Sequence, residues 1–479
     1  MFDYRTCGLD VQQQISNMDR RSTESDAPDK TAVKSEQTRA LILSVAAKLF
    51  RDEGYSATTL RKIATAAHME AGSLYYHFAS KDAILDEILE LGVQYVLNAV
   101  QEVREYCRSS GTNFRQTFAS MIDTHLTHVL REGSFTSANI RNYSRLPLSR
   151  RSPHRKLRRT YTSIWDDFLA EAQKAGDIRI DIKVVPLRQF VLGAMNWTVE
   201  WYDAKRYPVS MLSERMSKLL LDGMSTAHGL PLKQPDPMEL ETLEVIAAEG
   251  GKASRTRAQV LSAAARIFRD RGYKAATMRD IAQEAGMEAG SIYYHFSSKD
   301  EILDEVLDIG LRALLRGVSA TLLQKSQFPD HRSRIAAAIR THMEYLFSLS
   351  EFTSANIRIY GQLPEKVRTR HQPIRHKYAN LWDDCLRKAQ EAGELRSDIK
   401  VVPLRQAMLG ALNWTVEWFN PEKSQRDGYY SLPELIGMLQ SLLLDGLQYE
   451  AGPSLRRRKL ASTDKRTRRR VLPAGSCAG

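Results

Sequence analysis

The sequence predicts an all-α protein in which one pair of domains occurs twice. The segment that begins at Gly54 recurs at Gly272, an offset of 218, and later segments that begin at Phe135, Asp181 and Asn196 recur at an offset of 217. Apolar residues recur at intervals of three and four, as on one face of a helix, and no alternating stretch of strand length stands out. Each copy has roughly 200 residues, far more than the 20 to 50 residues of a solenoid unit. The chain is therefore a duplicated domain pair.

Composition narrows the function classes. The net charge of +12 indicates a polyanionic partner, either nucleic acid or an anionic membrane surface. Residues 1–33 contain no apolar core of a signal peptide, and no later run approaches the roughly 18 apolar residues that span a bilayer. No two cysteines are spaced for a zinc clip; they are Cys7, Cys107, Cys385 and Cys477. We expect a cytoplasmic protein with no metal, no cofactor and no membrane span.

The elements follow in order along the chain. Residues 1–33 are predicted to be disordered, 34–90 to form a first helix-turn-helix domain and 91–224 a first helical domain. Prolines and glycines in 225–254 indicate a linker. The second copy then repeats the pair over 255–307 and 308–449, and 450–479 is predicted to be a disordered basic tail. That tail holds most of the charge excess, since residues from Leu455 onward have nine basic and one acidic side chain, or +8.

Each copy opens with a long amphipathic helix. Its apolar residues are spaced for one buried face, at Ile42, Val45, Ala46, Leu49 and Phe50 and again at Val260, Ala263, Ala264, Ile267 and Phe268. Gly54 and Gly272 end this helix. Thr59 and Thr277 are placed to cap a short second helix, and Asp280 lies favourably in its first turn.

A third short helix completes a helix-turn-helix layout. The pattern TxRxIAxxAxMEAGSxYYHFxSKDxIL, present in both copies, resembles the DNA-binding domain of the TetR family of transcriptional repressors. The resemblance implies recognition helices at Ala71–Phe78 and Ala289–Phe296. Ala71, Gly72 and Ser73 are small enough to let this helix approach bases and phosphates closely.

The resemblance also assigns contacts to double-stranded DNA. It implies base reading by Arg61 and phosphate or capping contacts from Thr59, Tyr75, His77 and Lys81, with Tyr76 beside them. In the second copy the matching set is Thr277, Arg279, Ala289, Gly290, Ser291, Tyr293, Tyr294, His295 and Lys299. The alternative for any one tyrosine, histidine or lysine is an ordinary surface position, whereas Leu74, Phe78, Ile292 and Phe296 are expected in the core.

The two turns differ. Gly286 occupies the turn of the second unit, but His68 stands there in the first. A left-handed turn position costs a non-glycine residue about 1 kcal/mol, although histidine tolerates it better than most. We expect the first unit to be less stable.

The duplication suggests an internal dimer. The resemblance implies two-fold dimers on palindromic operators, so we hypothesise a single-chain pseudo-dimer that reads two similar half-sites. A linker raises the effective concentration of the second head. A further dimer of chains remains open.

The later parts of each copy resemble TetR-family domains that sense fatty-acyl or steroid-derived coenzyme A thioesters, through FTSANIR, IWDD or LWDD, and NWTVEW. The candidate ligand residues of the first copy are Asn139, Arg141, Arg151, Arg158, Asn196, Trp197 and Glu200. Those of the second are Asn356, Arg358, Arg368, Arg375, Asn413, Trp414 and Glu417. Eight basic and no acidic residues between Arg141 and Arg159 suit an anionic head group, although charge runs are usually solvated. Packing remains the alternative for both tryptophans.

We therefore expect a regulator whose effector shifts the spacing of its reading heads and releases DNA. Two other readings stay open: a ligand-independent DNA-architectural protein, and a repressor that senses drugs or other hydrophobic compounds. An enzyme is disfavoured because no serine, cysteine or aspartate is suitably spaced near the histidines His77, His154, His295 and His371.

Overall fold

A computed structural model describes residues 30–131, 134–143, 146, 148–223, 251–273, 276–324, 326–360, 363 and 365–446. Within these ranges the chain is helical and has no β-strand, which confirms the all-α fold. The predicted tail and nearly all of the predicted N-terminal segment and linker lie outside the described residues. Among the residues described, no helix is both long and apolar enough to cross a membrane.

Twelve elements are seen in the described residues of the first copy. In chain order they are α2 (Lys30–Asp52), η2 (Tyr55–Ala57), α3 (Leu60–Ala66), α4 (Ala71–His77), α5 (Lys81–Ser109), α6 (Phe114–Leu130), α7 (Ser134–Tyr143), α8 (Leu148–Arg151), α9 (Arg155–Ala175), α10 (Val184–Asn196), η3 (Trp197–Glu200) and α11 (Val209–Asp222).

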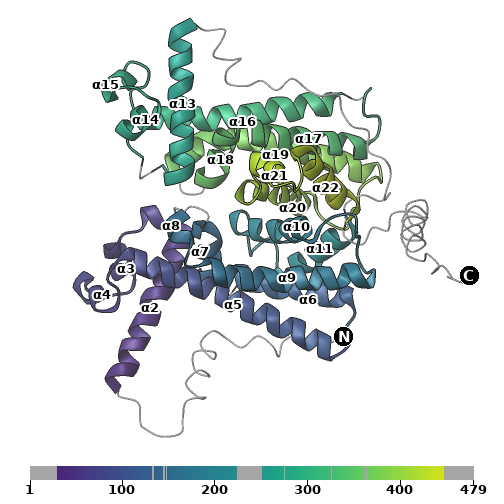
Figure 1. The fold of residues 1–479 in the computed structure, drawn as a ribbon, viewed down its shortest axis with the longest axis horizontal. Coiled ribbons are helices and arrows are strands. Elements are labelled where there is room, and N and C mark those ends of the chain that lie inside the picture. Colours follow the sequence, from purple (N-terminus) through teal and green to yellow (C-terminus); the bar gives the residue numbers. More distant parts are fainter. Residues whose placement is uncertain are drawn as a thin grey trace, which may run out of the picture.

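The described part of the second copy repeats the order of the longer helices, without counterparts of η2 and α8 and with the additional short helix α21. Its elements are α13 (Gly251–Arg271), α14 (Met278–Glu284), α15 (Ala289–Ile292), α16 (Lys299–Leu323), α17 (His331–Ser348), α18 (Ser350–Ile359), α19 (Glu365–Glu391), α20 (Val401–Asn413), η5 (Trp414–Glu417), α21 (Pro421–Arg426) and α22 (Leu432–Asp445). In Figure 1, α3–α4 and α14–α15 lie on the same side of the molecule, and α10, α11, α20 and α22 meet at its centre.

Four predicted domain boundaries fall inside helices: those after residues 33, 90, 254 and 307. α5 continues through the boundary predicted after residue 90, and α16 continues through the one predicted after residue 307. α13 already begins at Gly251, within the range predicted as linker. A helix that runs unbroken from the DNA-binding unit into the next domain couples the two mechanically.

Each DNA-binding unit has its own small core. Ile42, Ala46 and Phe50 of α2 are fully buried, as the spacing predicts. Thr59 caps α3 by accepting a hydrogen bond from the backbone of Lys62 (3.2 Å). The equivalent Thr277 forms a reciprocal capping box with Asp280 on α14. Leu74, Phe78, Ile292 and Phe296 are buried in these cores.

His68 adopts the left-handed conformation that its position predicts, with φ 55°, against 68° for Gly286. We expect His68→Gly to raise the free energy of unfolding of the first unit by about 0.5 kcal/mol. Relief of about 1 kcal/mol of strain exceeds the roughly 0.5 kcal/mol of backbone entropy that glycine loses on folding. Urea unfolding measures this, and Gly286→His, the mirror variant, should destabilise the second unit. Equal midpoints for all three chains would contradict the prediction.

One core joins the two copies. Helices α10 and α20 pack against each other, and a single apolar cluster continues from one copy into the other. A Cβ atom added at Gly193 would lie 2.8 Å from Cβ of Trp414, and one at Gly410 would lie 2.6 Å from Cβ of Trp197. These contacts leave no room for a side chain at either glycine.

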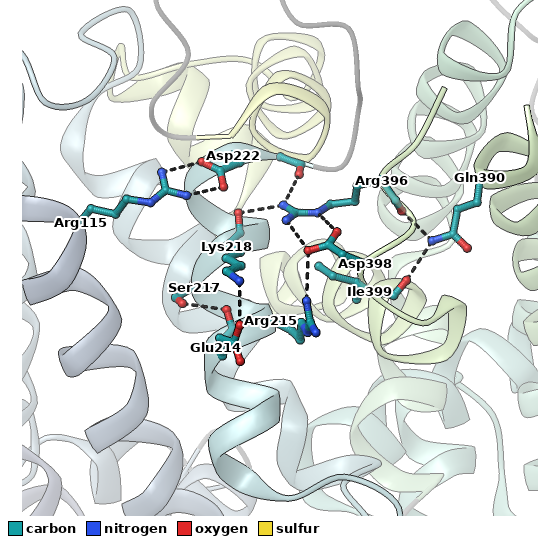
Figure 2. Close-up of polar contacts among 11 residues, drawn as sticks. Arg115, Glu214, Arg215, Ser217, Lys218, Asp222, Gln390, Arg396, Asp398 and Ile399 are labelled. Atoms are coloured by element: carbon teal, nitrogen blue, oxygen red, sulfur yellow. Dashed lines mark hydrogen bonds and ion pairs between the residues drawn. The ribbon is translucent and has the colours of Figure 1, made fainter. Parts of the chain in front are cut away.

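An arginine of each copy bonds the end of the last described helix of the other copy, as Figure 2 shows for Arg396 and α11. Nη1 of Arg396 donates to the carbonyls of Lys218 and Gly223, both at 3.1 Å. Arg179 similarly donates to Gly446 O (3.4 Å). Carbonyls at the end of a helix lack partners within it, so the bonds to Gly223 and Gly446 satisfy groups that the helices leave unpaired.

Candidate nucleic-acid interface and ligand site

Helix α4 presents two tyrosines to solvent. Tyr75 is 59% exposed and Tyr76 is 92% exposed, while Leu74 anchors the same helix in the core. Ala71, Gly72 and Ser73 at its start are exposed as well. A helix anchored by one buried leucine thus offers small residues and two aromatic rings to a partner.

The predicted recognition helices are too long. α4 ends at His77, because Phe78 turns into the core with an extended backbone (φ −141°). α15 ends already at Ile292, and the backbone continues in hydrogen-bonded turns with three-residue spacing, such as His295 N to Ile292 O (3.0 Å). Tyr293 and Tyr294 are nevertheless 59% and 90% exposed, so both units display the same rings.

An arginine of the first helix holds the end of each recognition segment. Arg39 donates to His77 O (2.6 Å) and lies over the Phe78 ring at 4.1 Å. Arg257 donates to His295 O (2.5 Å) and lies over Phe296 at 4.0 Å. These contacts fix the carboxyl end of each segment to the unit's scaffold.

The two predicted phosphate-binding lysines also bind their own units. Nζ of Lys81 donates to the carbonyls of Tyr55 (2.9 Å) and Thr58 (2.8 Å). Lys299 repeats these bonds with Tyr273 and Ala276. The lysines therefore tie the start of α5 and α16 to the loop before α3 and α14. Thr59, Arg61, Thr277 and Arg279 are exposed on the adjoining surface, and all DNA contacts stay predictions.

Helix α7 connects the DNA-binding unit with the domain that follows. Asn139 donates to Leu89 O of α5, and Asn142 donates to Phe50 O (3.2 Å) of α2. Arg141 donates to Arg51 O at the end of α2 and to Val199 O of η3, and it pairs with Glu200. Arg141 and Glu200, predicted to touch ligand, thus lie in the junction between domains. The side chain of Arg358, the counterpart of Arg141, lies outside the described residues.

Arg158 and Arg375 place a half-buried guanidinium in each copy, with the Nε atom of each fully buried. Nη2 of Arg158 donates to Asn139 Oδ1, and Nη2 of Arg375 donates to Asn356 Oδ1 (3.2 Å). Each guanidinium lies over a tyrosine ring, at 3.5 Å for Tyr143 and 3.4 Å for Tyr360.

No carboxylate among the described residues forms an ion pair with Arg158 or Arg375, and the Nε of each is buried without a hydrogen-bond acceptor. Burial lowers the pKa of each guanidinium to about 10. The carboxylates of Glu417 and Glu200, each from the opposite copy, raise these pKa values in part. A half-buried cation with a buried, unused donor is suited to binding an anion.

Asn196 and Asn413 belong to a buried network that the sequence reasoning missed. His125 lies between Tyr161 Oη (2.5 Å) and Asn196 Oδ1 (3.1 Å). His342 repeats this arrangement with Tyr378 (2.7 Å) and Asn413 (3.1 Å). The recurrence of the dipeptide Thr-His and of a tyrosine four residues before Trp165 and Trp382 was the available signal.

The network predicts a loss of stability in acid. Burial lowers the pKa of His125 and of His342 to about 4. Because the unfolded chain takes up these protons near pH 6.5, unfolding is favoured progressively as the pH falls from 6.5 toward 4. We expect each histidine to lower the free energy of unfolding by about 2 kcal/mol between pH 7 and pH 5. Urea unfolding across this range measures the slope, and His125→Gln with His342→Gln should flatten it; an unchanged slope would refute the assignment.

The remaining ligand candidates are dispersed. Trp197 packs against Gly410 of the other copy, and Trp414 packs against Gly193. Both tryptophans therefore have the packing role that the sequence analysis gave as the alternative to ligand binding. Arg151 donates to Leu146 O (2.7 Å), and Arg368 is exposed. Within the basic segment Arg150 pairs with Asp82 and Asp86 of α5, while Arg155, Lys156 and Arg159 are exposed.

A separate groove in the second copy lies between α13, α16 and α19. Its walls carry both signs of charge, from Arg257, Glu301, Asp304, Glu305, Asp308, Arg312, Arg370, His371 and Lys377. Asp304 pairs with Arg370 and with His371 (3.0 Å). Such a paired, polar surface does not suit an apolar ligand.

Comparison with known proteins identifies both halves of each copy. Residues 42–88 and 260–306 match the family model described as bacterial regulatory proteins, tetR family. Residues 111–224 and 329–447 match the tetracyclin repressor-like C-terminal domain.

Among similar proteins is the HTH-type transcriptional repressor KstR2 of Rhodococcus jostii, which is 29% identical over 202 residues, covering 42% of this chain and 97% of the relative. KstR2 of Mycobacterium tuberculosis is 30% identical over 178 residues, covering 36% and 84%. The fatty acid metabolism regulator protein of Bacillus subtilis is 24% identical over 193 residues, covering 40% and 94%. Each relative thus has about the length of one copy.

Proposed function

The chain belongs to the TetR family of bacterial regulatory proteins, and we propose that it is a ligand-responsive repressor whose two copies act as a single-chain pseudo-dimer on a near-palindromic operator. Membership makes it a DNA-binding transcriptional regulator. The observation that carries the finer proposal is the pair of matched recognition segments on one side of a molecule whose two copies share a core.

Several contacts support the pseudo-dimer. The glycine–tryptophan packing of α10 against α20 and the arginine caps on α11 and α22 are reciprocal, as in a two-fold dimer. Two DNA-binding units held in this way suit two half-sites whose centres are separated by one turn of DNA, about 34 to 36 Å, or by a multiple of one turn. A partner within the same chain removes the concentration dependence of dimerisation.

Arg158 and Arg375 support an anionic effector. Their buried Nε donors suit the phosphate or carboxylate of an amphiphile. We propose a fatty-acyl or steroid-derived coenzyme A thioester, a choice with which the name of the Bacillus subtilis relative agrees.

A chain of contacts supports the proposed coupling between effector and DNA. Arg158 of α9 bonds Asn139 of α7, which bonds the backbone of α5 at Leu89. Lys81 at the start of α5 holds the loop before α3. An anion that draws Arg158 away from Asn139 would remove one restraint on the side chain that ties α7 to α5, and we propose that the resulting movement of α7 changes the relative position of the heads.

Substituting the exposed tyrosines tests the DNA interface. We expect Tyr76→Ala with Tyr294→Ala to weaken binding about 100-fold while the unfolding midpoint stays constant, because these side chains are 92% and 90% exposed. Gel shifts with duplexes that the unaltered chain selects from a random DNA library measure the affinity. The control is Tyr106→Ala, at an exposed position (73%) on α5. Equal affinity for all three chains would reject the interface.

A further inference from the structure

Within the helix-turn-helix of each unit, the largest difference in charge lies in the helix before the recognition segment. The recognition segments are nearly identical, AGSLYYH from Ala71 and AGSIYYH from Ala289. The preceding helices are not: α3 reads LRKIATA and α14 reads MRDIAQE. Their third positions carry opposite charges, Lys62 in the first copy and Asp280 in the second.

Each of these residues forms an ion pair with a residue at or just beyond the end of the first helix of its unit, but the positions of the cation and the anion are exchanged between the two units. Nζ of Lys62 lies 2.5 Å from Glu53, just beyond the end of α2. Asp280 lies 3.3 Å from Nη1 of Arg271 at the end of α13. The side chains of Lys62 and Asp280 are 51% and 30% exposed. The first unit therefore carries its cation on α3, whereas the second carries its anion on α14.

The exchange of lysine for aspartate also changes the hydrogen bonds of the threonine that caps this helix. Asp280 accepts hydrogen bonds from the backbone N–H (2.9 Å) and the hydroxyl (2.6 Å) of Thr277. These bonds lower the pKa of the Asp280 carboxyl, so it stays ionised at neutral pH. In the first unit Thr59 faces the backbone of Lys62 and no carboxylate occupies that position. One turn later Glu284, paired with Arg266, stands where the first unit has Ala66.

The first helix of a helix-turn-helix crosses the DNA backbone, where phosphates fix position and the second helix reads bases. A lysine there attracts a phosphate and a carboxylate repels it. We propose that the two units bind unequal half-sites, alike in the bases opposite α4 and α15 but different in their flanking contacts, so that the chain binds its operator in one orientation. This inference rests on the proposed function and deepens it.

Selection of binding sites by the full-length chain from a random DNA library tests the inference. We expect inverted half-sites with matching inner bases and different flanks. A strictly symmetric consensus with equal flanks would overturn the inference while leaving the proposed function intact. If the chain selects no sequence, the proposed function itself fails.

Two neutralising variants give a second readout. On the selected duplex, Lys62→Gln should weaken binding about threefold to tenfold and reduce the salt slope by about one. Asp280→Asn should tighten binding by a similar factor and keep an amide in place of the capping carboxylate. Thermal unfolding checks that both variants remain folded. Shifts in the same direction, or none, would overturn the inference.

A reciprocal exchange provides the matched control. Lys62→Asp together with Glu53→Arg gives the first unit the ion pair of the second. The selected consensus should then become symmetric. An asymmetric consensus that survives this exchange would contradict a role for this pair.

Discussion

Replacing Gly193 and Gly410 with leucine should separate the two copies and weaken operator binding at least 100-fold. A side chain at either glycine would overlap Trp414 or Trp197, since even the Cβ atoms would approach to 2.8 and 2.6 Å. Relief requires displacing α10 from α20, and overpacking of this kind costs about 1 to 3 kcal/mol per site. The loss of affinity follows because the shared core no longer fixes the relative position of the two heads, so binding both half-sites must order them, which costs free energy that the linker alone does not supply.

Small-angle scattering would detect the separation, and gel shifts on the selected duplex would measure the affinity. Gly437→Leu is the control, because a Cβ at this position of α22 meets nothing within 4 Å. Each DNA-binding unit has a separate core, so both heads should stay folded in the double variant, which circular dichroism can verify. Compact chains with full affinity would refute the pseudo-dimer.

The second large effect concerns the effector. Arg158→Met with Arg375→Met should abolish the response of DNA binding to acyl-CoA. Because the variant lacks the bonds to Asn139 and Asn356 that the effector is proposed to break, its DNA affinity without ligand should fall toward that of the ligand-bound chain. The substitution removes two half-buried cations that form no ion pair among the described residues, but it also removes their hydrogen bonds to Asn139 and Asn356, so stability should fall by about 1 kcal/mol per site. A purely structural role would instead predict this loss of stability with an unchanged response to acyl-CoA.

The matched control removes two paired arginines. Arg188 bonds Asp166 and Arg405 bonds Asp383, each at 2.7 Å, so methionine at both positions leaves two carboxylates unpaired. This control should lose stability and keep its response to ligand. Titration of the DNA complex with oleoyl-CoA, a steroid-derived coenzyme A thioester and free coenzyme A measures the response. If the Arg158 and Arg375 double variant dissociates from DNA at the same thioester concentration as the unaltered chain, the proposed ligand site is rejected.

Local sequence was sufficient for the DNA-binding units. The spacing of Ile42, Ala46 and Phe50 predicted a helix with one buried face, and Thr59, Gly54 and His68 predicted its neighbouring cap and turns. Such features depend on residues a few positions apart. The lengths of the recognition helices were wrong because Phe78 and the turns after Ile292 respond to packing in the core.

The ligand site was predicted less well, because it depends on contacts between distant segments. Arg141 and Arg158 lie in the same basic segment, yet one bonds the end of α2 and η3 while the other lies over the ring of Tyr143. The buried position of His125 could not be predicted from local sequence, because its partners Tyr161 and Asn196 lie 36 and 71 residues away.

The sequence by itself determined the duplication, the all-α class and the recognition segments, since repeats and helical periodicity are properties of order along the chain. Only the tertiary structure decided that α10 packs against α20 and that the Nε of Arg158 is buried without a hydrogen-bond acceptor. It also decided that Lys62 pairs with Glu53 in the first copy, whereas Asp280 pairs with Arg271 in the second. These depend on which surfaces meet when apolar area is buried, and burial brings together residues that no spacing in the sequence relates.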